Sequence, residues 1–185
     1  MHETTLETGR LRLRPRVMAD VEANLAMDMD PEVHRYIFGD HPPHPDGHRN
    51  EIRRRIATGW PERGGVWVVE WKTAPGFLGW CGIFPLEESG LMEIGYRYVR
   101  TAWGQGIATE AARRVLDHGI RVLGIDPVVA VAHPDNLASQ NVIMKIGLKP
   151  EGTAFHYGQH LAFFRLGAAE YRAGRTPRPL VEGEN

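Results

Sequence analysis

A glycine-paired turn in the middle of the chain has the composition of an anion-binding site. It reads Trp103-Gly104-Gln105-Gly106-Ile107-Ala108-Thr109, and an amphipathic helical pattern follows at once. The first turn of a helix has N–H groups without intrahelical partners and carries the positive end of the helix dipole. Gly104 and Gly106 would let a phosphate approach these donors without obstruction by a Cβ atom. The spacing predicts a pyrophosphate site, although two such glycines also suit a plain strand-to-helix turn.

Two nucleotide-binding motifs with a similar turn do not fit these residues. A P-loop continues with Lys and then Ser or Thr, whereas Ile107 and Ala108 follow Gly106. A dinucleotide-binding fingerprint has a third small residue where Thr109 stands. Both nucleotide interpretations are therefore disfavoured.

A second polar cluster follows the apolar run 128–132, which has the composition of a strand buried on both faces. Ligands bind at the carboxyl ends of such strands in open sheets. Asn136 and Ser139 lie just beyond this end and open a helical pattern. As structural residues, Asp135 or Asn136 would cap the helix and Ser139 would be inert. As functional residues, they would offer an amide and a hydroxyl to a ligand.

An alternating strand pattern at 92–99 places Glu93, Gly95 and Arg97 on its less apolar face. Glu93 is our leading candidate for a general base, and an ion pair with an arginine is the alternative role for its carboxylate. His133, at the end of the next strand, is the reserve base.

Together these motifs resemble the GNAT N-acetyltransferases, and within them the branch similar to ribosomal-protein N-terminal acetyltransferases. The resemblance covers nearly the whole chain. Its motifs are residues 6–15, 93–96, 103–111, 136–139 and 145–148. The resemblance implies direct transfer of an acetyl group from acetyl-coenzyme A to a primary amine, without a covalent enzyme intermediate.

In this family the glycine turn holds the coenzyme pyrophosphate, and the preceding strand bulges so that its backbone pairs with the pantetheine arm. The coenzyme-binding residues implied here are Tyr98, Val99, Trp103, Gly104, Gln105, Gly106, Ile107, Ala108, Thr109, Asn136, Ser139 and Asn141. The implied catalytic residues are Ser139, which would stabilise the leaving thiolate, Glu93, and Asn136, which would contact the coenzyme arm. Backbone N–H groups near Tyr98 and Val99 would polarise the thioester carbonyl.

The acceptor amine belongs to a small molecule or to a peptide or protein N-terminus, and the sequence does not identify it. In similar enzymes the loops before the second strand form the wall on the acceptor side, which implies that Tyr36, Phe38, His41 and His44 contact the acceptor.

The three histidines His41, His44 and His48 also raise the hypothesis of a zinc site. No cysteine or carboxylate completes a convincing tetrahedral set, although Asp40 and Asp46 are near. We therefore predict no metal.

Two positions depart from the superfamily pattern. Thr101 stands where Gln or Arg is frequent, three residues before the first glycine, although Arg100 is adjacent. A tyrosine that serves as general acid in other branches is missing after residues 145–148. Because of Thr101 we expect the turn to bind phosphate more weakly, and because that tyrosine is missing we expect another residue to act as the general acid.

Cys81 lies in an apolar strand without a basic neighbour, which predicts a core residue rather than a nucleophile.

The elements that must position these residues follow from periodicity and turn signals. Expected strands cover 9–15, 66–71, 77–84, 92–99 and 128–132, followed by a final pair. Expected helices begin near Asp20, Asp30, Asp46, Ile107 and Asn136. The fold class is α/β (mixed α+β): a GNAT fold whose central, mixed but mostly antiparallel twisted sheet has about six to seven strands flanked by helices. We expect one domain over 1–173 and a flexible tail over 174–185.

Composition narrows the partners. The 185 residues carry a formal net charge of -1 and one cysteine, and no apolar run approaches a membrane span. These features predict a cytoplasmic protein, monomeric or homodimeric, that binds neither nucleic acid nor membranes. Two alternatives remain open: a catalytically impaired acyl-CoA-binding regulatory module, and an interaction domain that uses no coenzyme.

Overall fold

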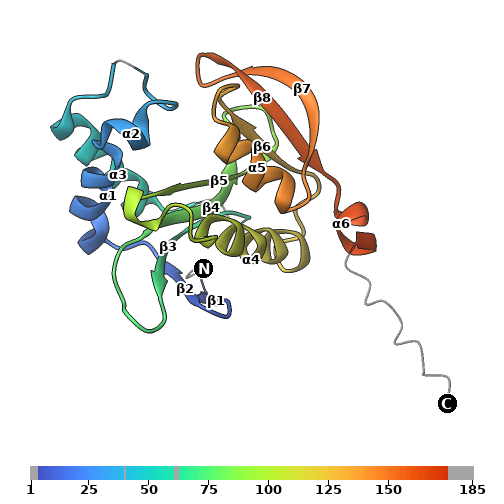
Figure 1. The fold of residues 1–185 in the computed structure, drawn as a ribbon, viewed down its shortest axis with the longest axis horizontal. Coiled ribbons are helices and arrows are strands. Elements are labelled where there is room, and N and C mark those ends of the chain that lie inside the picture. Colours follow the sequence, from blue (N-terminus) through green and yellow to red (C-terminus); the bar gives the residue numbers. More distant parts are fainter. Residues whose placement is uncertain (1–3, 40, 61–62, 175–185) are drawn as a thin grey trace.

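The computed structural model describes residues 4–39, 41–60 and 63–174. Its strands form one sheet in the order β1-β2-β3-β4-β5-β6-β8-β7 (Figure 1), antiparallel except between β5 and β6. The strands are β1 Leu6–Glu7, β2 Leu11–Pro15, β3 Gly65–Trp71, β4 Gly79–Pro85, β5 Met92–Tyr98, β6 Val128–Ala132, β7 Lys149–His156 and β8 Gln159–Leu166. The predicted fold class is confirmed, and the short β1 brings the sheet to 8 strands.

Helices cover this sheet because their apolar stripes match its apolar faces. The helices are α1 Val21–Asp28, α2 Pro31–His34, α3 Pro45–Thr58, α4 Ile107–Arg121, α5 Leu137–Lys145 and α6 Ala168–Gly174, with 3-10 turns at Met18–Asp20 and Arg100–Ala102. The buried face of α4, which includes Ala111, Val115 and Leu116, packs on β4 and β5. Helices α1 and α3 pack on each other through Val21, Leu25 and Ile52, at one side of the sheet (Figure 1).

Strands β5 and β6 part soon after they meet, as Figure 1 shows. Their parallel pairing is limited to Met92 with Val128 and Glu93 with Val129. Beyond these pairs β5 continues beside β4, whereas β6 continues beside β8. The split leaves the following backbone of β5 without a strand partner on that side, and Glu93 lies at the point of divergence.

Several helix boundaries differ from the sequence predictions. Asp30 caps α2 by accepting a hydrogen bond from Glu32 N–H, as expected. Asp20 precedes α1, but its carboxylate binds Arg14 and Val17 N–H rather than that helix. The cap of α3 is His44 and not Asp46, because Pro45 suits the first helical position and Asp46 lies inside the helix.

The C-terminal end adds α6, which the sequence analysis did not predict. Tyr171 anchors this helix, since its ring is buried and its hydroxyl donates to Asp117 Oδ1 at 2.8 Å. Of the predicted tail, Gly174 ends α6 and residues 175–185 lie outside the described residues.

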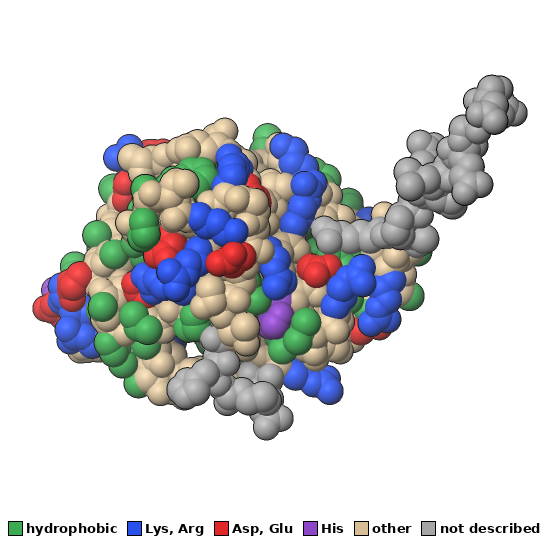
Figure 2. Space-filling model, turned by 90° about the horizontal axis from the view of Figure 1, so that it is seen from below, with side chains coloured by type: hydrophobic (Ala, Val, Ile, Leu, Met, Phe, Trp, Pro, Cys, Tyr) green, Lys and Arg blue, Asp and Glu red, His purple; other side chains and the backbone are tan. Residues whose placement is uncertain are grey.

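The surface has no field of a single sign on the face shown in Figure 2, where Lys and Arg side chains alternate with Asp and Glu. This pattern agrees with the formal net charge of -1. Within the described ranges, no helix is long and apolar enough to cross a membrane.

Candidate active site

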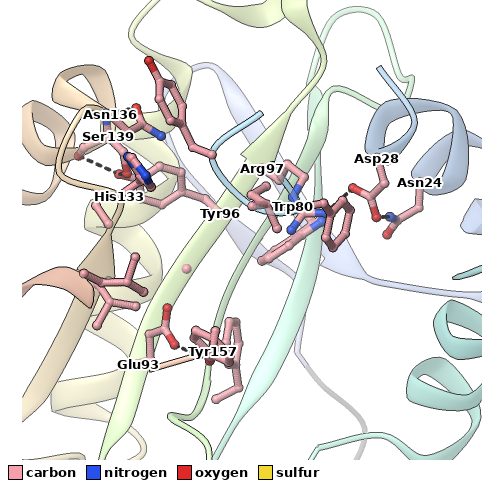
Figure 3. A pocket seen from close by; sticks show the side chains of 18 of the residues that line it. Asn24, Asp28, Trp80, Glu93, Tyr96, Arg97, His133, Asn136, Ser139 and Tyr157 are labelled. Atoms are coloured by element: carbon pink, nitrogen blue, oxygen red, sulfur yellow. Dashed lines mark hydrogen bonds and ion pairs between the residues drawn. The ribbon is translucent and has the colours of Figure 1, made fainter. Parts of the chain in front are cut away.

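A cavity of about 670 Å³ opens where β5 and β6 diverge (Figure 3). Strands β4, β5 and β6, helix α5, the β7–β8 turn and the segment from α1 to α3 all contribute to its wall. The predicted site residues that line it are Tyr36, Phe38, Glu93, His133, Asn136 and Ser139. The fold thus brings together residues that lie far apart in the sequence, between positions 36 and 139.

Glu93 has the environment of a proton acceptor. Its side chain is buried, with a residue exposure of 6%, and Oε2 accepts a hydrogen bond of 2.6 Å from the Tyr157 hydroxyl. Burial raises the pKa of Glu93 from 4.5 to about 7, and the charge of Glu87 adds to the rise, while the Tyr157 bond opposes it. A carboxylate poised near neutral pH is suited to general base catalysis. No ion pair of Glu93 with an arginine occurs among the described residues, so the alternative role is not observed.

Tyr157 was missed by the sequence analysis. It lies in the turn between β7 and β8 with φ of 52°, and its N–H donates to Glu87 Oε1 at 3.0 Å. His156 contacts the other oxygen of the same carboxylate at 2.8 Å. Burial and the neighbouring Glu93 raise the pKa of Tyr157, so its hydroxyl stays protonated and donates. A Tyr-Gly turn in the last hairpin was the available signal, but only the folded sheet places it beside Glu93.

We expect Tyr157→Phe to move the acidic limb of the pH–rate profile toward higher pH by about 1 to 2 units, because a hydrogen bond to a carboxylate is worth roughly 1.5–3 kcal/mol. The variant removes the donor that lowers the Glu93 pKa. Initial rates between pH 5 and 9 with one fixed amine would measure the limb. His156→Gln, which alters the same turn without touching Glu93, is the control. If the acidic limb of the pH–rate profile did not move, Tyr157 would not influence the group whose titration controls the rate.

Ser139 and Tyr96 form a hydroxyl pair on the opposite wall of the cavity (Figure 3). The Tyr96 hydroxyl lies 3.1 Å from Ser139 Oγ and donates to Ser139 O at 3.0 Å. Asn136 caps α5, since its Oδ1 accepts from Ser139 N–H at 3.0 Å. The structural role of Asn136 is therefore present, and the same bond fixes the position of Ser139 beside the cavity.

The glycine turn has the geometry of a phosphate cradle. Gly104 and Gly106 adopt φ of 73° and 75°, and Gly106 caps α4. The first helical bond runs from Glu110 N–H to Gly106 O, so the N–H groups of the preceding helical turn have no acceptor within the helix. A Cβ at Gly104 would meet open space, as expected of a surface that approaches a ligand.

The loop around Thr101 is braced by other residues. Gln105 Nε2 donates to Thr101 O at 2.6 Å, and Arg10 Nη2 donates to Gln105 O at 3.1 Å. Arg10 also binds Glu110 through Nε at 2.7 Å. A cationic guanidinium from β1–β2 thus lies beside the turn, at a site that the sequence analysis did not connect with it.

The strand before the turn requires two corrections. Pairing between β4 and β5 keeps one register over Met92–Tyr98, so the implied bulge is not present in this pairing. Val99 N–H donates to Leu78 O at 3.0 Å and is therefore not free to polarise a thioester. Because bonding alternates along a strand, the N–H groups of Tyr96 and Tyr98 point toward the gap instead. Tyr98 O accepts from Trp103 Nε1 at 2.9 Å.

The remaining coenzyme-binding predictions differ in exposure. Ile107 is buried and packs in the core, so only its backbone can face a ligand. Trp103 has an exposure of 48%. Ala108 and Thr109 are half-buried on α4, and Asn141 is exposed and does not line the cavity.

The acceptor-side histidines are not where the resemblance implied. His41 and His44 do not line the cavity, and His44 is used as the cap of α3. His48 does line it, with Nε2 2.8 Å from Asp28 Oδ2. Among the described residues, which do not include Asp40, no group of three His, Cys, Asp or Glu side chains is placed to hold a metal ion.

The reserve base His133 accepts a hydrogen bond at Nδ1 from Asp135 N–H at 3.2 Å, which leaves Nε2 as its available nitrogen.

Cys81 is fully buried in β4, and burial raises the pKa of its thiol. It does not line the cavity. The prediction of a core residue is confirmed.

Comparisons with known proteins agree with this architecture. The model of the acetyltransferase (GNAT) domain matches residues 10–149. An uncharacterized N-acetyltransferase, YoaA of Bacillus subtilis (strain 168), is 31% identical over 82% of this chain and 86% of its own length. The crystal structure of a GNAT-family acetyltransferase from Bacillus anthracis aligns with a TM-score of 0.75 and 21% identity, over 90% of this chain and all of that one.

Mycobacterium smegmatis RimJ, solved in complex with CoA-disulfide, aligns with a TM-score of 0.67 and 22% identity, over 95% of this chain and 98% of that one. The family model covers more than half of the chain, and the split sheet has the same fold as these enzymes. The chain therefore belongs to the GNAT superfamily and is an N-acetyltransferase.

Proposed function

We propose that this enzyme transfers acetyl directly from acetyl-coenzyme A to the primary amine of a small molecule or of a peptide or protein N-terminus, without a covalent enzyme intermediate. The observation that carries the proposal is a single cavity lined by a buried carboxylate with a pKa of about 7 and, across from it, by the hydroxyl pair of Tyr96 and Ser139. One group accepts a proton and the other donates one, as acyl transfer to an amine requires. The burial of Cys81 supports a mechanism without a thioester on the enzyme.

The residues at the turn fit the coenzyme. When bound, acetyl-coenzyme A supplies an activated thioester. The backbone N–H groups at the start of α4 would hold the pyrophosphate, with the charge of Arg10 beside them. The gap-facing edge of β5 would bind the pantetheine arm through Tyr96 and Tyr98 backbone groups, and Asn136 would contact the arm from α5.

Each side chain then has a defined role. Glu93 accepts the proton of the attacking amine, directly or through one water, and Tyr157 donates to its carboxylate in the ionised state. The Ser139 hydroxyl donates to the departing sulfur, where negative charge develops. Tyr96 holds that hydroxyl in place by turning its own proton from Ser139 O to Ser139 Oγ, which lies 3.1 Å away. The backbone N–H of Tyr98 is the candidate donor to the thioester carbonyl.

Calorimetric titration with acetyl-coenzyme A, coenzyme A and ATP tests the donor site, and thioester consumption with a panel of primary amines tests the reaction. We expect both coenzymes to bind, ATP not to bind, and at least one amine to be acetylated. Binding without turnover of any amine would favour the impaired regulatory module. No binding of either coenzyme would refute the donor site.

Gly106→Val should weaken acetyl-coenzyme A binding by about 10-fold or more, because a branched side chain would crowd the phosphate-facing turn and disfavour its left-handed backbone. Gly106 has φ of 75°. Gly124→Val is the matched control, since Gly124 has φ of 66° near the other end of α4 and a Cβ there would meet open space. Calorimetry on both variants measures the effect. Equal affinities in the two variants would contradict the phosphate assignment.

A further inference from the structure

One face of the β4–β5 pair forms a floor with an acidic and a basic end. Register pairs Phe84 with Glu93, Gly82 with Gly95, and Trp80 with Arg97. Side chains at alternate positions of a strand share a face, so these six residues point the same way. Phe84, Glu93, Gly95, Trp80 and Arg97 all line the cavity. The paired glycines leave no side chain of their own between the two ends.

The floor between the charges is apolar. A Cβ on Gly95 would lie 2.8 Å from Cζ of Phe84, which shows that the Phe84 ring lies against the bare backbone of Gly95. Phe84 also stacks on Trp60, with ring centroids 5.1 Å apart. A methylene or aromatic linker would therefore find an apolar contact between Glu93 and Arg97.

Arg97 has the environment of a fixed anion-binding group. Its side chain is 16% exposed, and its guanidinium carbon lies 5.6 Å from the ring centroids of both Phe38 and Trp80. Nη1 donates to Asp28 Oδ1 at 2.6 Å. Nε is buried and has no hydrogen-bond partner among the described residues. Arg97 lines the cavity and keeps part of its side chain exposed there, so a carboxylate in the cavity can approach its guanidinium.

Asp28 pairs with Nη1 of Arg97 and not with Nε, and both of its oxygens are engaged. Oδ2 lies 2.8 Å from His48 Nε2 and accepts from Asn24 Nδ2 at 2.8 Å. Burial alone would raise the pKa of Asp28, but the His48 bond and the Arg97 charge lower it overall. Asp28 thus stays ionised and holds the Arg97 guanidinium through Nη1, as Figure 3 shows for these labelled residues.

We propose that Arg97 binds a carboxylate of the acceptor while the reacting amine lies at the Glu93 end, so that the acceptor is an extended amino carboxylic acid. This inference rests on the proposed acetyl transfer at the same cavity. Glu93 and Arg97 are four positions apart on β5, which places their Cα atoms about 13 Å apart along the strand. An α-amino acid is too short for this span, whereas an ω-amino acid with several methylene groups fits it.

The test is calorimetric titration of the coenzyme A complex with 4-aminobutanoate, 6-aminohexanoate and 8-aminooctanoate. Hexylamine and 6-aminohexanamide are the matched ligands without a carboxylate. We expect one of the two longer acids to bind about 10- to 100-fold more tightly than the neutral ligands, as a charge-assisted hydrogen bond predicts. The binding readout does not depend on turnover.

Variants locate the carboxylate. Arg97→Gln should abolish the preference for the acid, and Asp28→Asn should retain it. The double variant Asp28→Asn with Arg97→Gln restores the charge balance around Asp28, and we expect it to remain without the preference. Arg55→Gln is the control, because Arg55 lines the same cavity but is half-exposed and bound to Glu51.

Three results would overturn the proposal. These are equal binding of the acids and the neutral ligands, an acid preference that survives Arg97→Gln, and recovery of that preference in the double variant. In turnover assays Arg97→Gln should raise KM for the acid and leave kcat nearly unchanged, since the carboxylate is remote from the reacting atoms. Failure of acetyl-coenzyme A to bind would instead count against the proposed function, so the two failures are distinguishable.

Discussion

Replacing Glu93 with Gln should lower kcat/KM for acetyl transfer by about 100- to 10,000-fold, the range typical of the loss of a general base. Glutamine keeps the size of the side chain and can still accept a hydrogen bond from Tyr157, so the cavity should remain intact. The wild-type rate should rise with pH through an apparent pKa of about 7, because only ionised Glu93 accepts a proton. The variant should lack this limb. Steady-state rates across pH 5 to 9 measure both effects.

The same substitution should stabilise the fold at alkaline pH. The Glu93 pKa rises from 4.5 to about 7 on folding, so between these values the folded protein binds more protons than the unfolded chain. The free energy of unfolding therefore falls as pH increases through this window, on the order of 3 kcal/mol in total. Glutamine does not ionise, so the variant avoids this loss of stability. At pH 8 we expect Glu93→Gln to unfold at a higher urea concentration than the wild type.

Glu70→Gln is the matched control for this pair of effects. Glu70 is also buried, but it lies on β3 outside the cavity and pairs with Arg14. Its replacement should destabilise the protein and leave the pH limb in place. If Glu93→Gln kept the rise of rate with pH, or if His133→Gln lost it instead, Glu93 would not be the general base.

The features predicted correctly from the sequence are those encoded within one segment. The glycine turn, α4 and the polar start of α5 depend on residues a few positions apart, whose backbone preferences and helical period are local. Alternation along β5 likewise placed Glu93, Gly95 and Arg97 on one face, and the structure agrees. The 8-strand sheet exceeds the expected number only by β1, which is too short to have a pattern.

The features that were missed depend on contacts between distant segments. Tyr157 reaches Glu93 from 64 residues away, through the pairing of β8 with β6. Arg10 reaches the glycine turn across 95 residues and braces the loop in which Thr101 departs from the superfamily pattern. The helical and strand periodicity of a sequence does not reveal contacts between segments this far apart. The structure gives His44 a local role that the sequence analysis did not assign, since it caps the helix that begins at Pro45.

Ser139→Ala should lower kcat by about 10- to 1000-fold and leave coenzyme affinity nearly unchanged, because the hydroxyl acts where charge develops on the departing sulfur. Burial raises the pKa of Tyr96, so its hydroxyl remains protonated beside Ser139 Oγ. The Asn136 cap uses the Ser139 backbone N–H, which alanine retains. The helix should therefore stay folded, and rapid-mixing assays of thioester cleavage would report the chemical step.

A double-mutant cycle with Tyr96→Phe tests whether the two hydroxyls act as a unit. If Tyr96 works by holding Ser139 Oγ, Tyr96→Phe should be harmful in the wild type and nearly neutral in Ser139→Ala, since residues that act together are not additive. Independent, additive losses would mean that Tyr96 reaches the sulfur or the acceptor itself. An unchanged kcat in Ser139→Ala would remove the serine from the mechanism and make Tyr96, which lines the same wall, the next donor to test.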